Sequence, residues 1–251
     1  MDEDIEKVIG DGGPWKLGDP GAPSHTLSIQ GPEFKIILPD VPNRLDVPAP
    51  TQTPWSGVGL LNFFKQGNLV LVGSGFLCQP DVLVTAKHNL TAKQYDAAGV
   101  WMGFDAKHNP HIQPVTIKAY AVHKDLDLAI FILASPQFGA FELGGQLPAA
   151  HAGVALAGYA LPYPNGAVRF SYGIGPVKAA DTSRLAYAIN TREGDSGAPV
   201  FTVVNGIPHA VGVHTEAATI LQLGNSGVHL SPPVVQDLFK MIAWARGQIG
   251  G

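Results

Sequence analysis

Short runs of apolar residues, some alternating with polar ones, recur along the chain from Trp55 onward. Runs of this kind, bounded by Gly, Pro, Asn and Asp, are typical of β-strands. Their density predicts an all-β barrel or sandwich rather than a parallel sheet with crossover helices. The runs cover residues 58–64, 69–77, 81–86, 111–122, 126–133, 153–160, 167–175, 184–190, 198–204, 209–215 and 227–231.

The two ends of the chain follow other patterns. Residues 10–54 are rich in Gly and Pro, which disfavours regular elements and predicts an extended arm or leader segment. Near the other end, Ser231 can cap a helix and Pro232 suits its first turn. Apolar residues then recur at helical spacing, so we expect one α-helix packed on the barrel. These apolar positions are Val235, Leu238, Phe239 and Ile242.

The composition is that of a folded protein, because 45% of the 251 residues are hydrophobic and only 14% are charged. A chain of this length can bury a large core, as one domain or two small ones. The net charge of −4 and the lack of a basic run disfavour nucleic acid and anionic membranes as partners.

The cysteine count and the N-terminus narrow the cellular context only partly. Cys78, the single cysteine, excludes an intramolecular disulfide, and its apolar neighbours favour a small buried hydrophobe over a reactive thiol. No apolar stretch approaches the ~18 residues of a membrane span. The acidic start lacks the apolar core of a secretory signal peptide, so the compartment stays open.

Residues 194–197, Gly-Asp-Ser-Gly, lie just before an apolar run and have two interpretations. They suit a tight turn, because Gly tolerates positive φ and Asp and Ser bond to nearby backbone. Alternatively Ser196 is a nucleophile, which requires a base for its proton and donors for the resulting oxyanion. A histidine and a carboxylate that orients it complete that chemistry.

Both partners occur upstream at strand ends. His88 follows the apolar run that ends at Thr85, and Asp127 heads the run "LAIFIL". Each has a structural interpretation by itself, as a loop or turn residue. The order His88, Asp127, Ser196, with separations of 39 and 69 residues, is much harder to explain by chance.

The segments "TAKH", "DLDLAIF" and "GDSGAPV" resemble the three signature blocks of the chymotrypsin-like serine proteases, in that family's order. The resemblance implies two six-stranded antiparallel β-barrels with His88, Asp127 and Ser196 in the cleft between them. The backbone amides of Gly194 and Ser196 would form the oxyanion hole. Asp125 is an alternative to Asp127 for the role of the acid. The resemblance of the segment Asp-Leu-Ala-Ile to the family's signature block favours Asp127.

Within that family, further segments resemble the glutamyl endopeptidase branch over roughly residues 36–246: "IILPDVPNRLDV", "NTREGDSGAPVF", "VGVHT" and "NSGVHLS". That resemblance implies that Thr191 and His214 bind a Glu or Asp side chain before the scissile bond. Neutral or protonated, an imidazole can donate to a carboxylate, as can a hydroxyl. Glu216 stands where the family more often has glycine, and it could repel an acidic substrate or neutralise His214.

Many proteases of this family become active when cleavage frees an α-amino group. Ile36 after Lys35 resembles such a start best, and Val8 after Lys7 resembles it less well. The branch usually has Asn or Gln where this chain has Asp195. A buried Asp195 would need a cationic partner, which the freed amine could supply; the alternative is an ordered arm with Asp195 satisfied locally.

The expected organisation follows from these resemblances. Residues 1–35 form an N-terminal arm or pro-segment, and 36–145 form the first barrel with its leading arm. Residues 146–231 form the second barrel, and 232–251 form the C-terminal helix and tail.

Two further motifs carry little weight. His108 and His111 have metal-ligand spacing but lack a nearby Cys or acidic cluster, so we expect no metal site. The glycosylation sequon at Asn89 would put a glycan beside His88 and obstruct the cleft.

The leading hypothesis is a monomeric serine endopeptidase that needs no cofactor or metal and acts on a protein or peptide. The order of the three residues excludes the α/β hydrolases, which place Ser before Asp and His in a Gly-x-Ser-x-Gly turn. A non-catalytic binding module is the rival, because charged Arg192 and Glu193 beside Gly194 could accompany a collapsed oxyanion loop. A third hypothesis is an intracellular peptidase specific for one partner protein.

Overall fold

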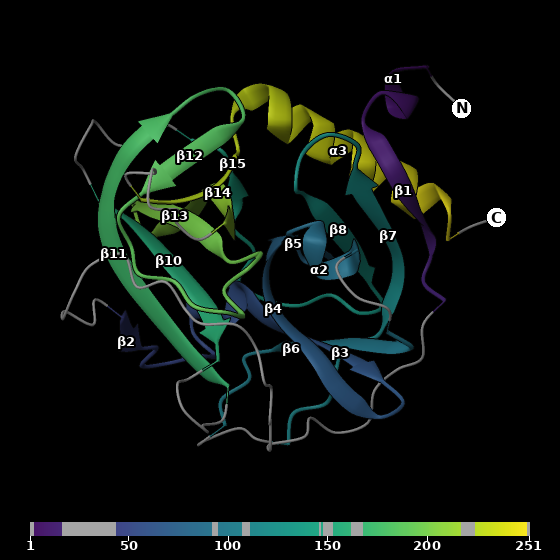
Figure 1. Ribbon diagram of the computed structural model, residues 1–251, viewed down its shortest axis with the longest axis horizontal. Coiled ribbons are helices and arrows are strands. Elements are labelled where there is room, and N and C mark those ends of the chain that lie inside the picture. The colour runs from purple at the N-terminus through teal and green to yellow at the C-terminus, as the bar shows by residue number, and fades with distance from the viewer. Residues whose placement is uncertain are drawn as a thin grey trace.

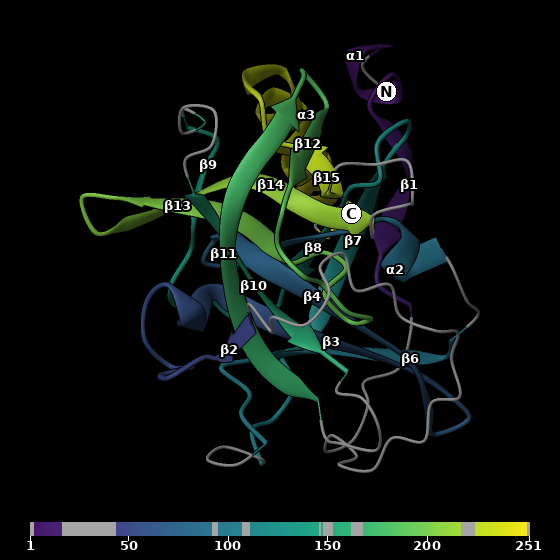
Figure 2. The same cartoon turned by 60° about the vertical axis from the view of Figure 1, so that its left-hand side comes forward.

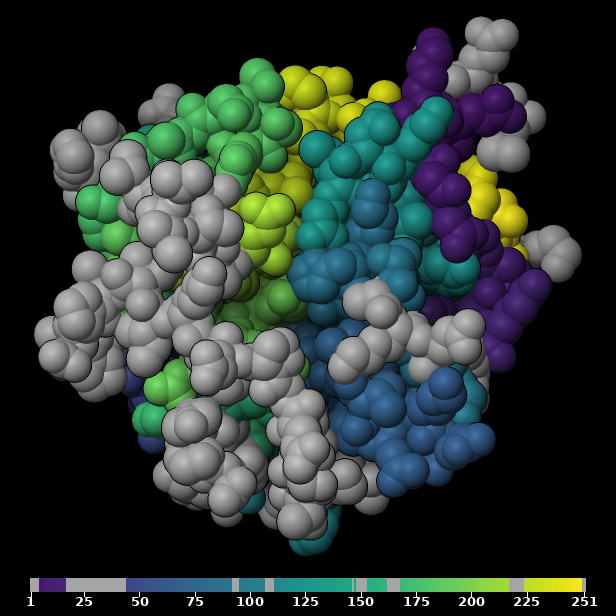
Figure 3. Space-filling view, in the orientation of Figure 1, coloured from purple at the N-terminus to yellow at the C-terminus, as the bar shows by residue number. Residues whose placement is uncertain are grey.

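The fold is taken from a computed structural model of the chain. It describes residues 3–16, 44–91, 95–106, 111–145, 147, 153–161, 168–216 and 224–249. Two antiparallel sheets lie side by side, and a long helix runs along one end of the molecule (Figure 1). Figure 3 shows the same face in space-filling form, where the blue and teal residues of the first sheet lie beside the green residues of the second.

The first sheet has the order β1-β7-β8-β5-β4-β3-β6. A bridge between Val100 on β6 and Val115, just ahead of β7, links the two ends of the six strands that follow β1 in this order. Those six strands therefore curl into a barrel, with β1 added outside it. The strands of this sheet are β1 (Ile9–Pro14), β3 (Val58–Lys65), β4 (Asn68–Gln79), β5 (Val82–Thr85), β6 (Ala97–Met102), β7 (Ile117–His123) and β8 (Ala129–Leu133).

The second sheet has the order β10-β13-β14-β15-β12-β11-β2, and β10 also pairs with β11. That additional pairing closes six strands into a barrel, so the predicted architecture of two six-stranded barrels is confirmed. The strands of this sheet are β2 (Arg44–Asp46), β9 (Glu142–Leu143), β10 (Gly153–Ala160), β11 (Arg169–Ala180), β12 (Arg184–Tyr187), β13 (Pro199–Val204), β14 (Ile207–Glu216) and β15 (Asn225–His229).

The apolar runs become strands because each can bury its side chains in a barrel interior or against a neighbouring layer. All four residues of β5 and all five of β8 are buried. Aromatic rings then join the barrels: the Phe141 ring lies 5.5 Å from that of Phe76 and 5.3 Å from that of Phe201. Because one apolar cluster includes residues of both barrels, their junction is a packed core.

Two short N-terminal strands each extend one of the two sheets. β1, from the expected arm, pairs with β7 and lies at the outer edge of the first sheet. β2, expected to accompany the first barrel, pairs instead with β11 of the second sheet (Figure 2). Neither segment has strong apolar alternation. Each becomes a strand because its backbone pairs with the edge of an existing sheet, and the pattern of apolar residues does not reveal such pairing.

The helices are short except at the C-terminus: α1 (Glu3–Glu6), the 3₁₀ turn η1 (Trp55–Gly57), α2 (His88–Thr91) and α3 (Pro232–Gly247). The predicted C-terminal helix is thus present, and it packs on β7 and β8. Leu238 is buried, whereas Phe239 is 49% exposed. The Ser231 hydroxyl does not cap the helix, because it donates to the Thr182 carbonyl instead.

Two observations concern membrane-spanning helices and the reactivity of the single cysteine. None of the helices in the described ranges has the length and hydropathy needed to cross a membrane. Burial raises the pKa of the Cys78 thiol on β4 to about 12, so the thiol stays protonated near neutral pH and is a poor nucleophile.

Candidate active site

His88 and Asp127 lie together because their strands are paired. β5 ends at Thr85 and β8 begins at Ala129, and these two residues are partners in the antiparallel ladder. The segment after Thr85 and the segment before Ala129 therefore lie next to each other at the same end of these two strands. The His88 ring Nδ1 lies 2.6 Å from Asp127 Oδ2, and the His88 backbone amide donates to Asp127 Oδ1 at 2.8 Å.

Both oxygens of the Asp127 carboxylate are thus engaged by one residue. Burial alone would raise the pKa of this carboxyl, but hydrogen bonds from His88 and the charge of its ring hold the pKa below its ordinary value. Asp127 is therefore an ionised acceptor, which keeps the His88 proton on Nδ1. Nε2 of the neutral imidazole is then the proton acceptor.

The competing carboxylate, Asp125, does not reach His88. Asp125 is exposed, and its backbone amide donates to His123 Nδ1 at 3.1 Å. The Lys87 ammonium holds the same loop from the other side, since it donates to the carbonyls of His123 and Lys124. These contacts fix the loop in which Asp127 faces His88.

Ser196 lies in the loop before β13, and donors from β4 and from the short helix α2 hold its backbone. The Ser196 carbonyl accepts hydrogen bonds from the Ser74 amide at 2.8 Å and from Asn89 Nδ2 at 2.9 Å. Asn89 directly follows His88, so a side chain adjacent to His88 bonds directly to the Ser196 backbone. The next residue, Gly197, has φ +89°, and a Cβ there would lie 2.1 Å from the Ser74 carbonyl oxygen.

The peptide between Glu193 and Gly194 has a fixed orientation. The Leu161 amide donates to the Glu193 carbonyl at 2.9 Å. Because a trans peptide is planar with its N–H opposite its C=O, the Gly194 amide points away from Leu161. The Gly194 carbonyl in turn accepts from the Ser74 hydroxyl at 2.8 Å. In the described part of the chain, no acceptor contacts the Gly194 or Ser196 amide.

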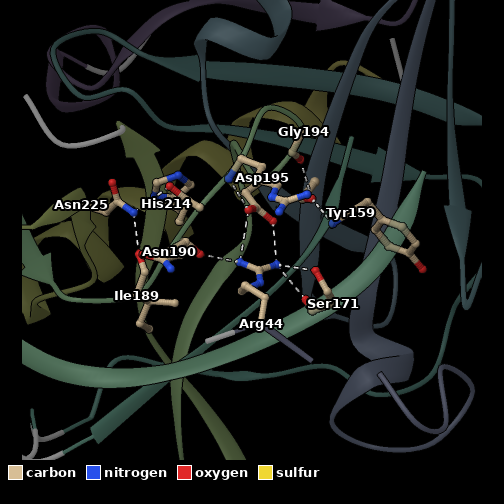
Figure 4. A network of polar contacts seen from close by, with 12 residues as sticks. Arg44, Tyr159, Ser171, Ile189, Asn190, Gly194, Asp195, His214 and Asn225 are labelled. Carbon is tan, nitrogen blue, oxygen red and sulfur yellow. Dashed lines mark hydrogen bonds and ion pairs between the residues drawn. The ribbon is translucent and has the colours of Figure 1, made fainter. Parts of the chain in front are cut away.

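Asp195, between these two residues, is fully buried and is paired with Arg44 (Figure 4). The Arg44 guanidinium binds both carboxylate oxygens, with Nη2 2.9 Å from Oδ1 and Nη1 3.1 Å from Oδ2. The Arg192 amide also donates to Oδ2, at 2.8 Å. The cationic partner that a buried Asp195 requires is therefore supplied by β2 of the same chain.

Of the two candidate cleavage sites, the structure describes only the one before Val8. Lys35 and Ile36 lie outside the described residues. Val8 is buried, its amide donates to the Ile5 carbonyl, and its carbonyl accepts from the Lys124 amide. Val8 is thus part of an ordered segment leading into β1, away from Asp195.

Thr191 and His214, expected to bind the substrate side chain, belong to one buried network. Asn225 Nδ2 on β15 donates to Thr191 Oγ1 at 2.7 Å. Tyr187, the ladder partner of Asn225, has its hydroxyl 2.6 Å from His214 Nδ1. Thr191 and His214 are only 6% and 3% exposed.

Burial sets the charge of this network. It lowers the pKa of His214 to about 4, so the ring is neutral near pH 7. It also raises the pKa of Tyr187 well above its ordinary value, so the phenol keeps its proton and donates it to His214 Nδ1. The remaining His214 proton is then on Nε2.

Glu216 has its own partners. Its carboxylate is 3.5 Å from Arg184 Nη2 and accepts a hydrogen bond from the Ser226 hydroxyl at 3.3 Å. The side chain is 62% exposed, and among the described residues no hydrogen bond joins it to His214. Of the two effects that Glu216 could have, repulsion of an acidic substrate or neutralisation of His214, no hydrogen bond in the described residues supports the second.

Sequence analysis missed four residues that shape this site. Arg44 could have been found by searching every basic residue for a partner to a buried Asp195. Ser74, Asn89 and Asn225 carry no comparable signal, because a small polar residue beside an apolar run is common in any β protein. Of the two histidines with metal-ligand spacing, His108 lies outside the described residues.

Comparisons with known proteins identify the family and the fold. Residues 73–211, more than half of the chain, match the trypsin-like peptidase domain. A solved structure described as "Structure of Glu endopeptidase in complex with MPD" superimposes with a TM-score of 0.65 and 19% sequence identity. The superposition covers 83% of this chain and 100% of that one. No curated protein sequence matches. The chain belongs to the trypsin-like peptidase family and has the chymotrypsin-like fold.

Proposed function

We propose that this protein is a serine endopeptidase in which Ser196 is the nucleophile, His88 the general base and Asp127 the residue that orients His88. One observation carries the proposal. His88 is held by both oxygens of Asp127, and the residue that follows it donates directly to the Ser196 backbone. These contacts bring the backbone of Ser196 next to the segment that carries His88, which supports the proposed pairing of nucleophile and base.

The steps follow from this arrangement. Ser196 Oγ attacks the carbonyl carbon of the peptide while His88 Nε2 takes its proton. The tetrahedral oxyanion accepts hydrogen bonds from the Gly194 and Ser196 amides, and the C–N bond breaks as His88 protonates the leaving amine. Water then attacks the acyl-enzyme carbonyl while His88 Nε2 takes one of its protons, and the bond from Ser196 Oγ to the acyl carbon breaks as His88 returns that proton to Oγ, which releases the acid and restores Ser196.

Asp127 contributes by its charge as well as its position. Its pKa lies below the ordinary value, so it is ionised throughout the neutral range. An ionised carboxylate stabilises the imidazolium that forms when His88 accepts a proton. The held Glu193 carbonyl argues against a silenced oxyanion loop, which the rival binding-module hypothesis requires.

Thr191 and His214 support a preference for Glu or Asp before the scissile bond. Asn225 donates to Thr191 Oγ1, which leaves the hydroxyl proton free for another acceptor. His214 carries its proton on Nε2 because Nδ1 accepts from Tyr187. A carboxylate would be bound by neutral donors in a desolvated network, where hydrogen bonds discriminate strongly.

A fluorophosphonate probe tests the chemistry. We expect one equivalent to label the chain at Ser196, located by mass spectrometry, and S196A and H88A to remain unlabelled while keeping wild-type circular dichroism. If the folded wild-type chain neither labels nor cleaves casein, with or without trimming to Ile36, the protein is a binding module.

Matched peptides test the specificity separately. Peptides differing only in Glu, Asp, Leu or Arg before the scissile bond are compared by kcat/KM for the wild type and for T191V. We expect Glu to be the best substrate, and T191V to lower kcat/KM for Glu about 10-fold or more while changing the value for Leu little. Equal rates for Glu and Leu would keep the peptidase and exclude the acidic preference.

A further inference from the structure

Asp195 poses an electrostatic problem at the centre of the site. Its side chain has no exposed surface, and it stands between the two residues whose amides would form the oxyanion hole. An isolated buried carboxylate is strongly unfavourable, so it must be paired and hydrogen bonded. The way in which it is paired therefore decides the conformation of residues 194–196.

We propose that Arg44 is a positioning residue for catalysis: its guanidinium keeps the loop around Asp195 competent, so the chain is active without proteolytic release of an N-terminal amine. This inference rests on the proposed peptidase function and extends it to regulation. Of the two alternatives that the sequence left open, it favours Asp195 satisfied within the chain over activation by cleavage before Ile36.

The Arg44 guanidinium binds both oxygens of the Asp195 carboxylate. Nη1 and Nη2 each bind one oxygen of Asp195, in the fork geometry that matches a carboxylate. The Arg192 amide adds a third hydrogen bond. Neither oxygen of Asp195 lacks a donor, so the buried charge needs no further cation.

The same guanidinium also donates hydrogen bonds to groups on either side of Asp195, in the loop and on β11. Nη1 donates to the Asn190 carbonyl at 3.3 Å, at the start of the nucleophile loop. Nη2 donates to the carbonyl and the hydroxyl of Ser171 on β11, at 2.8 and 3.0 Å. Figure 4 shows Arg44 between these groups, so the loop is tied to the wall of the second barrel.

β2 delivers Arg44 to this place. Arg44 pairs with Gly173 and Asp46 pairs with Ser171, so β2 extends the sheet beyond β11. Arg44 itself is 10% exposed. A second arginine acts at the same strand pair without touching the loop: Arg169 on β11 forms an exposed ion pair with Asp46. Arg169 therefore provides a matched control.

The first test uses the uncleaved chain, verified by intact mass before and after the assay. It should label with fluorophosphonate at Ser196 to full stoichiometry and hydrolyse peptide at the same kcat as a chain trimmed to Ile36. An uncleaved chain that is inert, and that gains labelling only on trimming, overturns the inference while leaving the peptidase proposal standing. Failure of both forms would instead exclude the peptidase itself.

The second test removes the cation. In R44A we expect kcat to fall about 100-fold, the loss typical of a misplaced oxyanion donor, with KM changed less than about 3-fold. R169A should keep wild-type kcat and KM. Millimolar guanidinium chloride should restore much of the R44A activity, whereas sodium chloride at equal concentration should not.

The conservative variant keeps the test decisive if R44A does not fold. R44K retains a cation but loses the fork, so we expect kcat between those of R44A and wild type with labelling still complete. Wild-type kcat in R44A, or a loss in R44A that guanidinium leaves unchanged while R44K is equally inactive, would overturn the positioning role.

Discussion

Ser74 is expected to be the most sensitive polar position outside the catalytic residues. It lies on β4 and is fully buried. Its hydroxyl donates to the Gly194 carbonyl and accepts from the Tyr159 amide, both at 2.8 Å. S74A therefore removes a donor and an acceptor together and leaves two buried backbone groups of the second barrel without a partner.

The magnitude follows from those two groups. Leaving one buried donor or acceptor unsatisfied costs about 1–3 kcal/mol, so the pair predicts a loss of about 2–6 kcal/mol in the free energy of unfolding. The removed atom is small, and the cavity adds little. Since the Gly194 carbonyl also loses its anchor, we expect kcat to fall under conditions in which S74A remains folded.

Urea unfolding of the wild type, S74A and S135A measures the effect. Ser135 is exposed and contacts only the Gln137 side chain among the described residues, so S135A should stay within about 0.5 kcal/mol of the wild type. The midpoint of S74A should shift without a change in the denaturant slope. A loss below about 1 kcal/mol would refute the reasoning, because the two orphaned groups would then have found other partners.

Three further predictions concern single residues. G197A should cost about 3 kcal/mol or more, because φ is +89° and a Cβ would lie 2.1 Å from a backbone oxygen; G206A, with φ +81° in open space, is the control and should cost about 1 kcal/mol in the same urea experiment. D127N should lower kcat about 10⁴-fold while the variant keeps the circular dichroism spectrum of the wild type. Retention of more than a tenth of the wild-type kcat would contradict the orienting role of Asp127. Between pH 6.5 and 4 the unfolded chain protonates His214 while the folded chain does not, so the free energy of unfolding should fall by about 3 kcal/mol as the pH drops through this window. H214Q should lack that part of the pH dependence, and equal pH profiles for both proteins would show that burial does not keep His214 neutral.

The fold and the pairing of His88 with Asp127 could be predicted because local sequence carries their signals. Apolar runs with turn residues between them specify strands wherever a barrel interior can receive their side chains. His88 and Asp127 each stand next to such a run, so their separation in space follows from which strands pair. The order of the three residues and their resemblance to the protease signature blocks relate both to Ser196, and that relation stays a prediction.

Arg44 could not be assigned in this way, because its role depends on a contact across 151 residues of sequence. It lies on a strand of three residues, too short for any periodicity to be visible. A buried Asp195 was expected to need a cationic partner, but several cations could have satisfied that need. Only the register of β2 on β11 selects Arg44.

The loop that contains Ser196 holds its shape through groups outside it. Two of its residues, Gly194 and Gly197, have positive φ, so the loop has little conformational preference of its own for this geometry. Its carbonyls and its buried carboxylate instead accept hydrogen bonds from Leu161 and Arg44 on one side and from Ser74 on the other. When the carbonyls are satisfied in this way, the amides of Gly194 and Ser196 keep a fixed orientation, which is what the proposed oxyanion site would require. Since Ser74 belongs to the first barrel and Arg44 to a strand of the second sheet, a change that loosens the barrel junction should reduce kcat before it unfolds either barrel.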